Sequence, residues 1–222
     1  MISDNLKSVT KRIAKCCERS GRPEEAVKLV SVTKEADIEE MRAAILAGVT
    51  DIGENRVQDA VFKHKAIGDS VIWHLIGHLQ TNKAKDAVRI FSLIHSVDSI
   101  RIAEAIDKEA RKIGKVQEVL VQVNTSGEST KFGVHPEDVD NILRECALYG
   151  NIDIKGFMTI APETSNPETV RPYFRALNEL RGRIRTSRGV DYGALSMGMT
   201  GDFEVAIEEG ATIIRIGRAI FV

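Results

Sequence analysis

Eight short runs rich in valine, isoleucine and leucine alternate along the chain with longer amphipathic segments, and this alternation constrains the fold more than any other feature. The runs are largely apolar at successive positions, which is typical of parallel strands buried on both faces. They cover residues 27–33, 51–55, 71–77, 91–97, 118–124, 153–160, 194–199 and 212–217. The pattern predicts repeated βα units around a parallel sheet.

The segments between the runs have the spacing of helices that face a sheet. Met41 and Ile45 fall on one helical face, as do Ile142 and Cys146 in a later segment. Helix starts are marked by a capping residue or a first-turn proline at Asp37, Pro136 and Pro167. We therefore expect helices packed outside the sheet.

Eight parallel strands in 222 residues fit the lower end of the size range of a closed barrel. We expect an α/β protein with a single (β/α)8 TIM-type barrel domain over residues 1–222 and no C-terminal β domain. We also expect no helix after the last strand. An amphipathic amino-terminal segment carrying Leu6, Val9, Ile13 and Cys16 should close the ring in its place.

Composition excludes several classes of protein. Lys and Arg number 31 against 32 Asp and Glu, so the excess positive charge that nucleic acids or anionic membranes attract is missing. No apolar stretch approaches the roughly 20 residues of a membrane span, and the amino end has no signal-peptide core. The three cysteines include the adjacent Cys16 and Cys17, which suit reduced thiols. We expect a cytoplasmic protein.

Barrel enzymes and binding proteins carry their chemistry at the carboxyl ends of the strands. The polar residues just past each run are Lys34, Glu54, Asn55, His78, Gln80, Asn124, Thr159, Ser196–Thr200 and Arg215–Arg218. Lys34 is a candidate amine nucleophile, since a desolvated lysine at the mouth loses part of its affinity for a proton. Alternatively, Lys34 only marks the exit of its strand into water.

The last two runs end in glycine-containing turns that could hold a phosphate. Gly198, Gly201 and Gly217 permit close backbone approach, and Thr200 with Asp202 has the pattern of a helix cap. Backbone amides at such a turn bind dianions, and barrels commonly bind phosphate after strands seven and eight. Tight turns between barrel elements would need the same glycines, so both interpretations remain open at this point.

Seven stretches of the sequence resemble the pyridoxal phosphate homeostasis protein family, which is related to the barrel domain of alanine racemase. The resemblance covers nearly the whole chain. The stretches are SVTK (31–34), GENRVQD (53–59), WHLIGHLQTNK (73–83), QVNTSGESTKFG (122–133), KGFMTI (155–160), LSMGMTGDFEVAI (195–207) and RIGRAIF (215–221).

The resemblance implies that the chain holds pyridoxal 5′-phosphate, with each role carried over residue by residue. Lys34 matches the lysine that forms a Schiff base with the cofactor, and Asn55 matches a position near it. Ser196 and the backbone of Met197 match phosphate contacts after strand seven. Gly217 and its successor match phosphate contacts after strand eight.

Two arginines complete the implied site. Arg215 matches the arginine that faces the pyridine nitrogen, where a cation disfavours ring protonation and weakens the cofactor as an electron sink. At position 218 the family commonly has threonine or serine, whereas this chain has Arg218. Its guanidinium could contact the phosphate or point into solvent, and the sequence leaves both open.

The tyrosines argue against racemisation. Alanine racemase resembles a two-base enzyme in which a tyrosine from a second, carboxyl-terminal domain faces the Schiff-base lysine. Here Tyr149 and Tyr173 are predicted on outer helices, and Tyr192 precedes strand seven at the other end of the barrel. We therefore expect no catalytic residues.

Two further features have plain alternatives. His74 and His78 are four residues apart, but on a strand and its exit rather than on a helix, so we expect no metal site. Lys131 lies in a Gly- and Ser-rich loop after strand five, where it could close over the mouth or stay solvated.

The expected function is that of a pyridoxal phosphate reservoir or carrier, as a monomer, with apo pyridoxal phosphate-dependent enzymes as partners. The alternatives are a lysine Schiff-base barrel enzyme, racemase-like or aldolase-type, and an interaction protein without a ligand. The absorption of the protein with added cofactor distinguishes these possibilities, because only a Schiff base gives a visible band that depends on Lys34.

Overall fold

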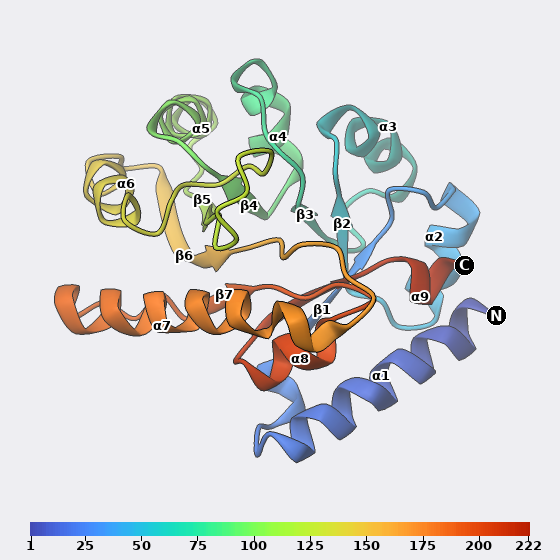
Figure 1. The fold of residues 1–222 in the computed structure, drawn as a ribbon. Coiled ribbons are helices and arrows are strands. Elements are labelled where there is room, and N and C mark those ends of the chain that lie inside the picture. The colour runs from blue at the N-terminus through green and yellow to red at the C-terminus, as the bar shows by residue number, and fades with distance from the viewer.

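The computed structural model describes residues 1–222, and its eight strands form one closed parallel barrel in chain order (Figure 1). Each strand pairs with the next, and the last pairs with the first. The strands are β1 (Lys28–Val32), β2 (Asp51–Glu54), β3 (Ile72–Leu75), β4 (Leu93–Val97), β5 (Gln117–Gln122), β6 (Ile152–Met158), β7 (Ala194–Ser196) and β8 (Ile213–Ile216). The predicted barrel is confirmed. No strand extends more than one residue beyond its predicted run.

Helices surround the barrel on its outer side (Figure 1). They are α1 (Ile2–Arg19), α2 (Ile38–Leu46), α3 (Val57–Ile67), α4 (Ala84–Ile90), α5 (Ile100–Lys112), α6 (Val139–Cys146), α7 (Arg171–Arg188), α8 (Phe203–Glu208) and α9 (Arg218–Phe221). Short 3-10 turns cover Glu24–Ala26, Thr81–Lys83 and Pro167–Val170. The predicted cap is confirmed at α2, where Asp37 accepts the Glu40 amide and Glu40 accepts the Asp37 amide.

The ring is closed by α1, as predicted, and its apolar face is buried against α8 and α9. Arg12 forms a two-pronged ion pair with Glu204 of α8 at 2.9 Å. Asn5 donates to the Ile220 carbonyl of α9 at 3.1 Å, so the two marked ends of the chain lie close together (Figure 1). The expectation that no helix follows the last strand is wrong, because α9 does. Its four residues are too few to show a helical period in sequence.

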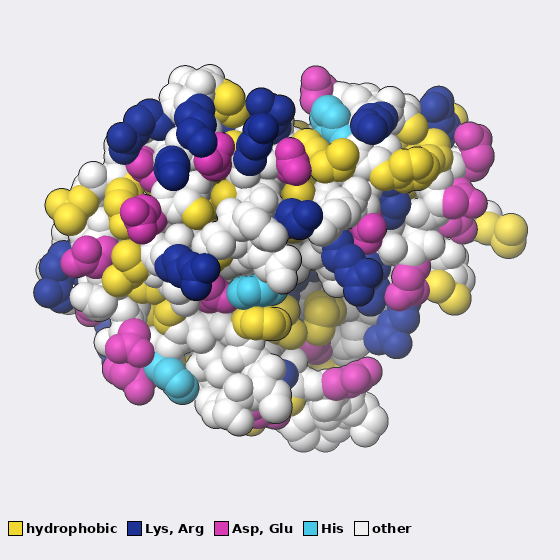
Figure 2. Space-filling view, turned by 90° about the horizontal axis from the view of Figure 1, so that it is seen from above, with side chains coloured by type: hydrophobic (Ala, Val, Ile, Leu, Met, Phe, Trp, Pro, Cys, Tyr) yellow, Lys and Arg dark blue, Asp and Glu magenta, His cyan; other side chains and the backbone are white.

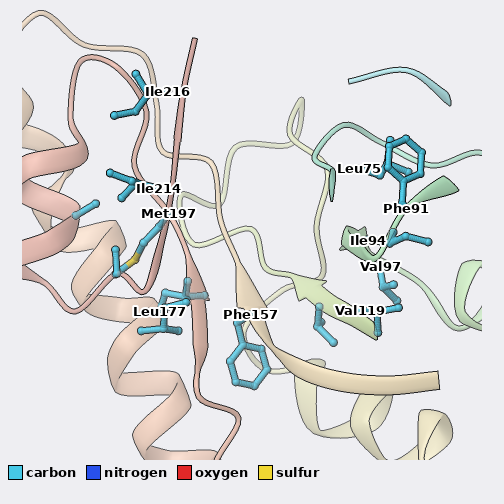
Figure 3. Close-up of a cluster of buried hydrophobic side chains, with 14 of the residues drawn as sticks. Leu75, Phe91, Ile94, Val97, Val119, Phe157, Leu177, Met197, Ile214 and Ile216 are labelled. Carbon is cyan, nitrogen blue, oxygen red and sulfur yellow. The ribbon is translucent and has the colours of Figure 1, made fainter. Parts of the chain in front are cut away.

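Two apolar layers hold the barrel together. The outer layer packs between strands and helices, and Figure 3 shows Leu177 of α7 beside Phe157 of β6 and Met197, which directly follows β7. The inner layer is a small cluster within the barrel, made of Val30, Leu93, Leu120, Met158 and Ile213. Because this inner apolar cluster is small, much of the remaining interior is left to polar side chains.

Charges of both signs are interspersed over the surface seen in Figure 2, with no single-sign field across that face. This distribution agrees with the formal net charge of −1. Every helix in the structure is too short or too polar to traverse a lipid bilayer. All three cysteines are free and buried.

Candidate functional site

Lys34 lies at the carboxyl end of the barrel, two residues after β1 ends. Its side chain is 48% exposed, and its Nζ atom is 3.3 Å from Glu35 Oε1. The neighbouring strand β8 runs parallel to β1, with Ser31 opposite Ile216. Lys34 and the residues that follow β8 therefore share the mouth of the barrel.

The backbone just before Lys34 is anchored by a buried ion pair. Glu54 Oε1 accepts hydrogen bonds from the Lys63 ammonium at 2.8 Å and from the Thr33 hydroxyl at 2.6 Å. Lys63 also donates to the Thr33 carbonyl, and the Thr33 amide donates to Gly53. The residue before Lys34 is thus held on three sides. Sequence reasoning noted Glu54 but missed Lys63, whose position on an outer helix gave no sign of burial.

Arg215 of β8 projects into the barrel and is 3% exposed. Its Nη1 donates to Ser196 Oγ at 2.6 Å, and its Nη2 donates to the Thr159 carbonyl at 2.9 Å. Burial lowers the pKa of Arg215 to about 10, and the Asp202 carboxylate opposes the shift. The guanidinium therefore stays cationic at neutral pH.

Ser196 ends β7, and its side chain is fully buried. Besides the bond from Arg215, its Oγ atom lies 2.9 Å from Nδ1 of His95 on β4. Strands β4 and β7 are not neighbours in the sheet, so this contact crosses the interior of the barrel. Sequence reasoning missed His95, because no local pattern shows that a strand histidine meets a serine 101 residues later.

The turn after β7 presents unpaired backbone donors. The Met197 amide donates to Ile213, and the Met199 amide donates to Asp202 Oδ1 at 2.6 Å. The amides of Gly198 and Thr200 bond to no other group of the protein. Gly198 has φ +91°, and an added Cβ would lie 2.6 Å from Ala206 Cβ, so only glycine fits this turn.

Gly217 and Arg218 follow β8 at the same end of the barrel. The Gly217 amide makes no backbone hydrogen bond, and an added Cβ would lie 3.1 Å from the Val32 carbonyl oxygen. This contact places Gly217 directly beside the end of β1, two residues from Lys34. The Arg218 side chain is exposed and forms no ion pair in the structure.

Asn55 follows β2 at the same rim and is exposed. It borders a polar cavity of about 470 Å³ that also receives Arg56, His78, Gln80 and Lys83. A larger hollow of about 780 Å³ lies between α1 and the amino ends of β1 and β2. Of the two, only the smaller cavity lies at the carboxyl ends of the strands, and Asn55 is the one predicted site residue that lines it.

The loop after β5 reaches back over the mouth. Asn124 holds the loop by accepting the Gly127 amide and donating to the Glu128 carbonyl. Phe132 stacks on His78, with ring centroids 4.0 Å apart and planes at 14°. Lys131 is 3.1 Å from Glu128, so its ammonium is partnered within the loop.

Tyr173 and Tyr192 lie where the sequence placed them, whereas Tyr149 lies beyond the end of its predicted helix, because α6 already ends at Cys146. Tyr149 follows α6, Tyr173 is on α7, and Tyr192 precedes β7 with its ring 5.7 Å from Phe157. No group of three or more His, Cys, Asp or Glu side chains is arranged to hold a metal ion.

Comparisons with known proteins identify the family of the chain. The family model described as the alanine racemase N-terminal domain matches residues 5–222. The curated pyridoxal phosphate homeostasis protein of Aquifex aeolicus is 46% identical over 219 residues, which cover 98% of this chain and 96% of that protein. The protein of the same name from Vibrio alginolyticus is 34% identical, with 99% and 96% covered.

Among solved structures, PipY of Synechococcus elongatus with bound pyridoxal phosphate superposes with a TM-score of 0.88, at 33% identity and complete coverage of both chains. Alanine racemase of Clostridium difficile is 17% identical with a TM-score of 0.77, and 56% of its length is covered, so this likeness concerns the fold alone. The chain belongs to the alanine racemase N-terminal domain family and, within it, to the pyridoxal phosphate homeostasis proteins.

Proposed function

We propose that this chain binds pyridoxal 5′-phosphate at the barrel mouth, as a Schiff base on Lys34, and acts in intracellular pyridoxal phosphate homeostasis without catalysing a reaction of its own. The observation that carries the proposal is the approach of Gly217 to Val32, which brings a free amide after β8 beside the strand that leads to Lys34. Close relatives bear the corresponding name, and PipY holds the cofactor.

The donors at the mouth fit the chemistry of a phosphate. The amides of Gly198 and Thr200 after β7 and of Gly217 after β8 have no partner within the protein. A phosphate dianion accepts several N–H donors at once, and glycine lets it approach the backbone closely. Since the Met197 amide already donates to Ile213, Met197 would lead the chain into this turn rather than bind through its own N–H.

Lys34 would supply the covalent link. Its Nζ would be the amine that condenses with the cofactor aldehyde, a reaction whose only other product is water. The ion pair with Glu35 is half exposed and breaks at little cost, so it does not hold Lys34 away from the mouth. Asn55 on the neighbouring rim would flank the bound ring.

The buried cation disfavours catalysis. Pyridoxal phosphate supplies an electron sink whose strength depends on protonation of its ring nitrogen. Arg215, fixed by Ser196 and the Thr159 carbonyl, would meet that nitrogen with a donor that keeps its own proton. None of the three tyrosines follows the carboxyl end of a strand, where a second base would be needed. These residues support a role in holding and handing over the cofactor to apo enzymes.

The test is a visible absorption spectrum of the protein with added pyridoxal 5′-phosphate, followed by borohydride reduction and peptide mapping. We expect a visible band in the wild type, loss of that band in Lys34→Ala, and the reduced adduct on Lys34. Lys131→Ala is the matched control, since it removes another lysine near the mouth and should keep the adduct on Lys34.

The outcomes separate the alternatives. A protein that stays colourless but forms a borohydride-trapped adduct with a phosphorylated sugar would favour an aldolase-type enzyme. A protein that binds neither compound would favour an interaction protein. Turnover of alanine at ordinary enzymatic rates, roughly 1 s⁻¹ or more, would overturn the non-catalytic proposal.

A further inference from the structure

A continuous series of hydrogen bonds crosses the barrel interior. We call the five side chains that form it the polar column; they are Arg215, Ser196, His95, His74 and Asp51. Arg215 Nη1 is 2.6 Å from Ser196 Oγ, which is 2.9 Å from His95 Nδ1. His95 Nε2 is 2.9 Å from His74 Nδ1, and His74 Nε2 is 2.9 Å from Asp51 Oδ1. The column joins the mouth of the barrel to its opposite end.

The column is sealed from water except at its far end. Ser196 and His95 are fully buried, and Arg215 and His74 are nearly so. Asp51 begins β2 and accepts from the half-exposed Lys28 ammonium at 2.9 Å. A polar atom buried in this way is stable only when it finds a hydrogen-bond partner, and each neighbouring pair in the column supplies one to the other.

The two ends fix the direction of every bond. A guanidinium only donates, and an ionised carboxylate only accepts. Burial alone would raise the pKa of Asp51, but hydrogen bonds from His74, Lys28 and Thr50 lower it to about 2, so it is ionised at neutral pH.

The internal members of the column then have one arrangement if both histidines are neutral. His74 donates from Nε2 to Asp51 and accepts at Nδ1, and His95 donates from Nε2 to His74 and accepts at Nδ1. Ser196 donates its hydroxyl proton to His95 and accepts from Arg215. The hydroxyl therefore has no proton left for a ligand.

On this basis we propose that His95 and His74 are positioning residues for Arg215, acting through the hydroxyl of Ser196. By accepting the hydrogen bond from the Ser196 hydroxyl, His95 directs the lone pairs of Ser196 toward Arg215. This holds the plane of the guanidinium in one orientation. The column would serve to present a fixed cation to the cofactor ring, and this part of the proposal rests on the proposed function. It also assigns Ser196 to the arginine rather than to the phosphate.

The first experiment uses the ligand-free protein, so it does not depend on cofactor binding. Two-bond ¹H–¹⁵N spectra of the imidazoles, assigned with His74→Phe and His95→Phe, should show both histidines protonated at Nε2. Separate Nη signals of Arg215 should report slow rotation of the guanidinium. A proton on Nδ1 of either histidine, or freely averaged Nη signals in the wild type, would overturn the proposal.

The second experiment tests the coupling through Ser196. We expect His95→Phe to speed guanidinium rotation and to weaken pyridoxal phosphate binding, each by up to about tenfold, which is the upper range for the loss of one neutral hydrogen bond. In a Ser196→Ala background the same change should have less than a twofold effect on either quantity. An undiminished effect there would contradict action through Ser196.

Variants of matched chemistry complete the design. His135→Phe makes the same change at an exposed histidine outside the column and should leave Arg215 rotation as in the wild type. His95→Gln retains an acceptor and should recover part of the slow rotation; no recovery would count against the acceptor role. If His95→Phe fails to fold, Ser196→Ala alone interrupts the column. Failure of the wild type to bind the cofactor would reject the proposed function but not the column.

Discussion

The Lys63 ammonium lies 2.8 Å from Glu54 Oε1 in the layer between α3 and the barrel, where Glu54 is fully buried. The other carboxylate oxygen, Oε2, has no hydrogen-bond partner. The pair thus rests on one strong contact, and the same ammonium also holds the Thr33 carbonyl beside Lys34.

Removing Lys63 should therefore be costly. We expect Lys63→Met to lower the free energy of unfolding by about 3–5 kcal/mol, because it leaves a buried carboxylate uncompensated. The double variant Lys63→Met/Glu54→Gln should recover part of that loss. Urea unfolding measures both, with Lys65→Met on the exposed face of the same helix as the control. Equal losses in the single and double variants would contradict this account.

Arg215 should not tolerate lysine. A single ammonium cannot reproduce the fork that reaches Ser196 Oγ and the Thr159 carbonyl together. We expect Arg215→Lys to lower the free energy of unfolding by about 1–3 kcal/mol, the range for a lost hydrogen bond at a buried charged group. Thermal and urea unfolding would show it. A loss below about 0.5 kcal/mol would mean that the fork is dispensable.

Acid should destabilise the fold through His95. Burial, together with His74 and Arg215, lowers the pKa of His95 well below its usual range. The unfolded chain then binds a proton near pH 6.5 that the folded chain refuses, so stability is full above that pH and falls as pH decreases. The slope from this group approaches about 1.4 kcal/mol per pH unit. Unfolding experiments from pH 7 to pH 5 should show a shallower slope in His95→Phe, and an unchanged slope in His135→Phe.

Gly198 should be sensitive to a single methyl group. Its φ of +91° and the 2.6 Å approach of an added Cβ to Ala206 predict a loss of about 1–3 kcal/mol in Gly198→Ala. Gly182 in α7 has open space around it, so Gly182→Ala should instead stabilise by about 0.5–1 kcal/mol. If the two variants unfold alike, the turn after β7 is less constrained than its geometry indicates.

Arg218 should assist the phosphate in a salt-dependent way. Its exposed guanidinium has no ion-pair partner, and it adjoins the free Gly217 amide. We expect Arg218→Ala to weaken pyridoxal phosphate binding about three- to tenfold at low ionic strength, and less at 0.5 M salt. Binding of pyridoxal, which lacks the phosphate, serves as the comparison and should not change. Equal effects on both compounds would place the guanidinium away from the phosphate.

The barrel could be predicted because each strand carries its own signal. Strand β4 is buried at every position from Leu93 to Val97, and such burial on both faces favours apolar residues whatever the rest of the chain contains. The one-turn helix α9 has no such signal, since four residues cannot show a period. Strands β5 and β6 each begin one residue earlier than expected, because their first residues, Gln117 and Ile152, pair with each other.

The candidate site also has a part that could be predicted from the sequence and a part that could not. The residues at strand ends, such as Lys34 and Arg215, could be named because topology alone assigns them to the mouth. The partners that fix them could not. His95 meets Ser196 across the barrel only after closure, and Lys63 reaches Glu54 from a helix whose buried face carries one cation among apolar residues. Such contacts depend on three-dimensional distance, which periodicity does not encode.

The docking of α1 has a consequence for how the molecule is assembled. Its Arg12 pairs with Glu204, 192 residues further along the chain, and β1 likewise pairs with β8. Because a chain is synthesised from its amino end, α1 and β1 must wait for α8 and β8 before they can make these contacts. Contacts between such distant parts of a chain slow folding and leave apolar surface exposed in the meantime. The α1–β1 region is therefore the part of the chain that we expect to need protection by chaperones during synthesis.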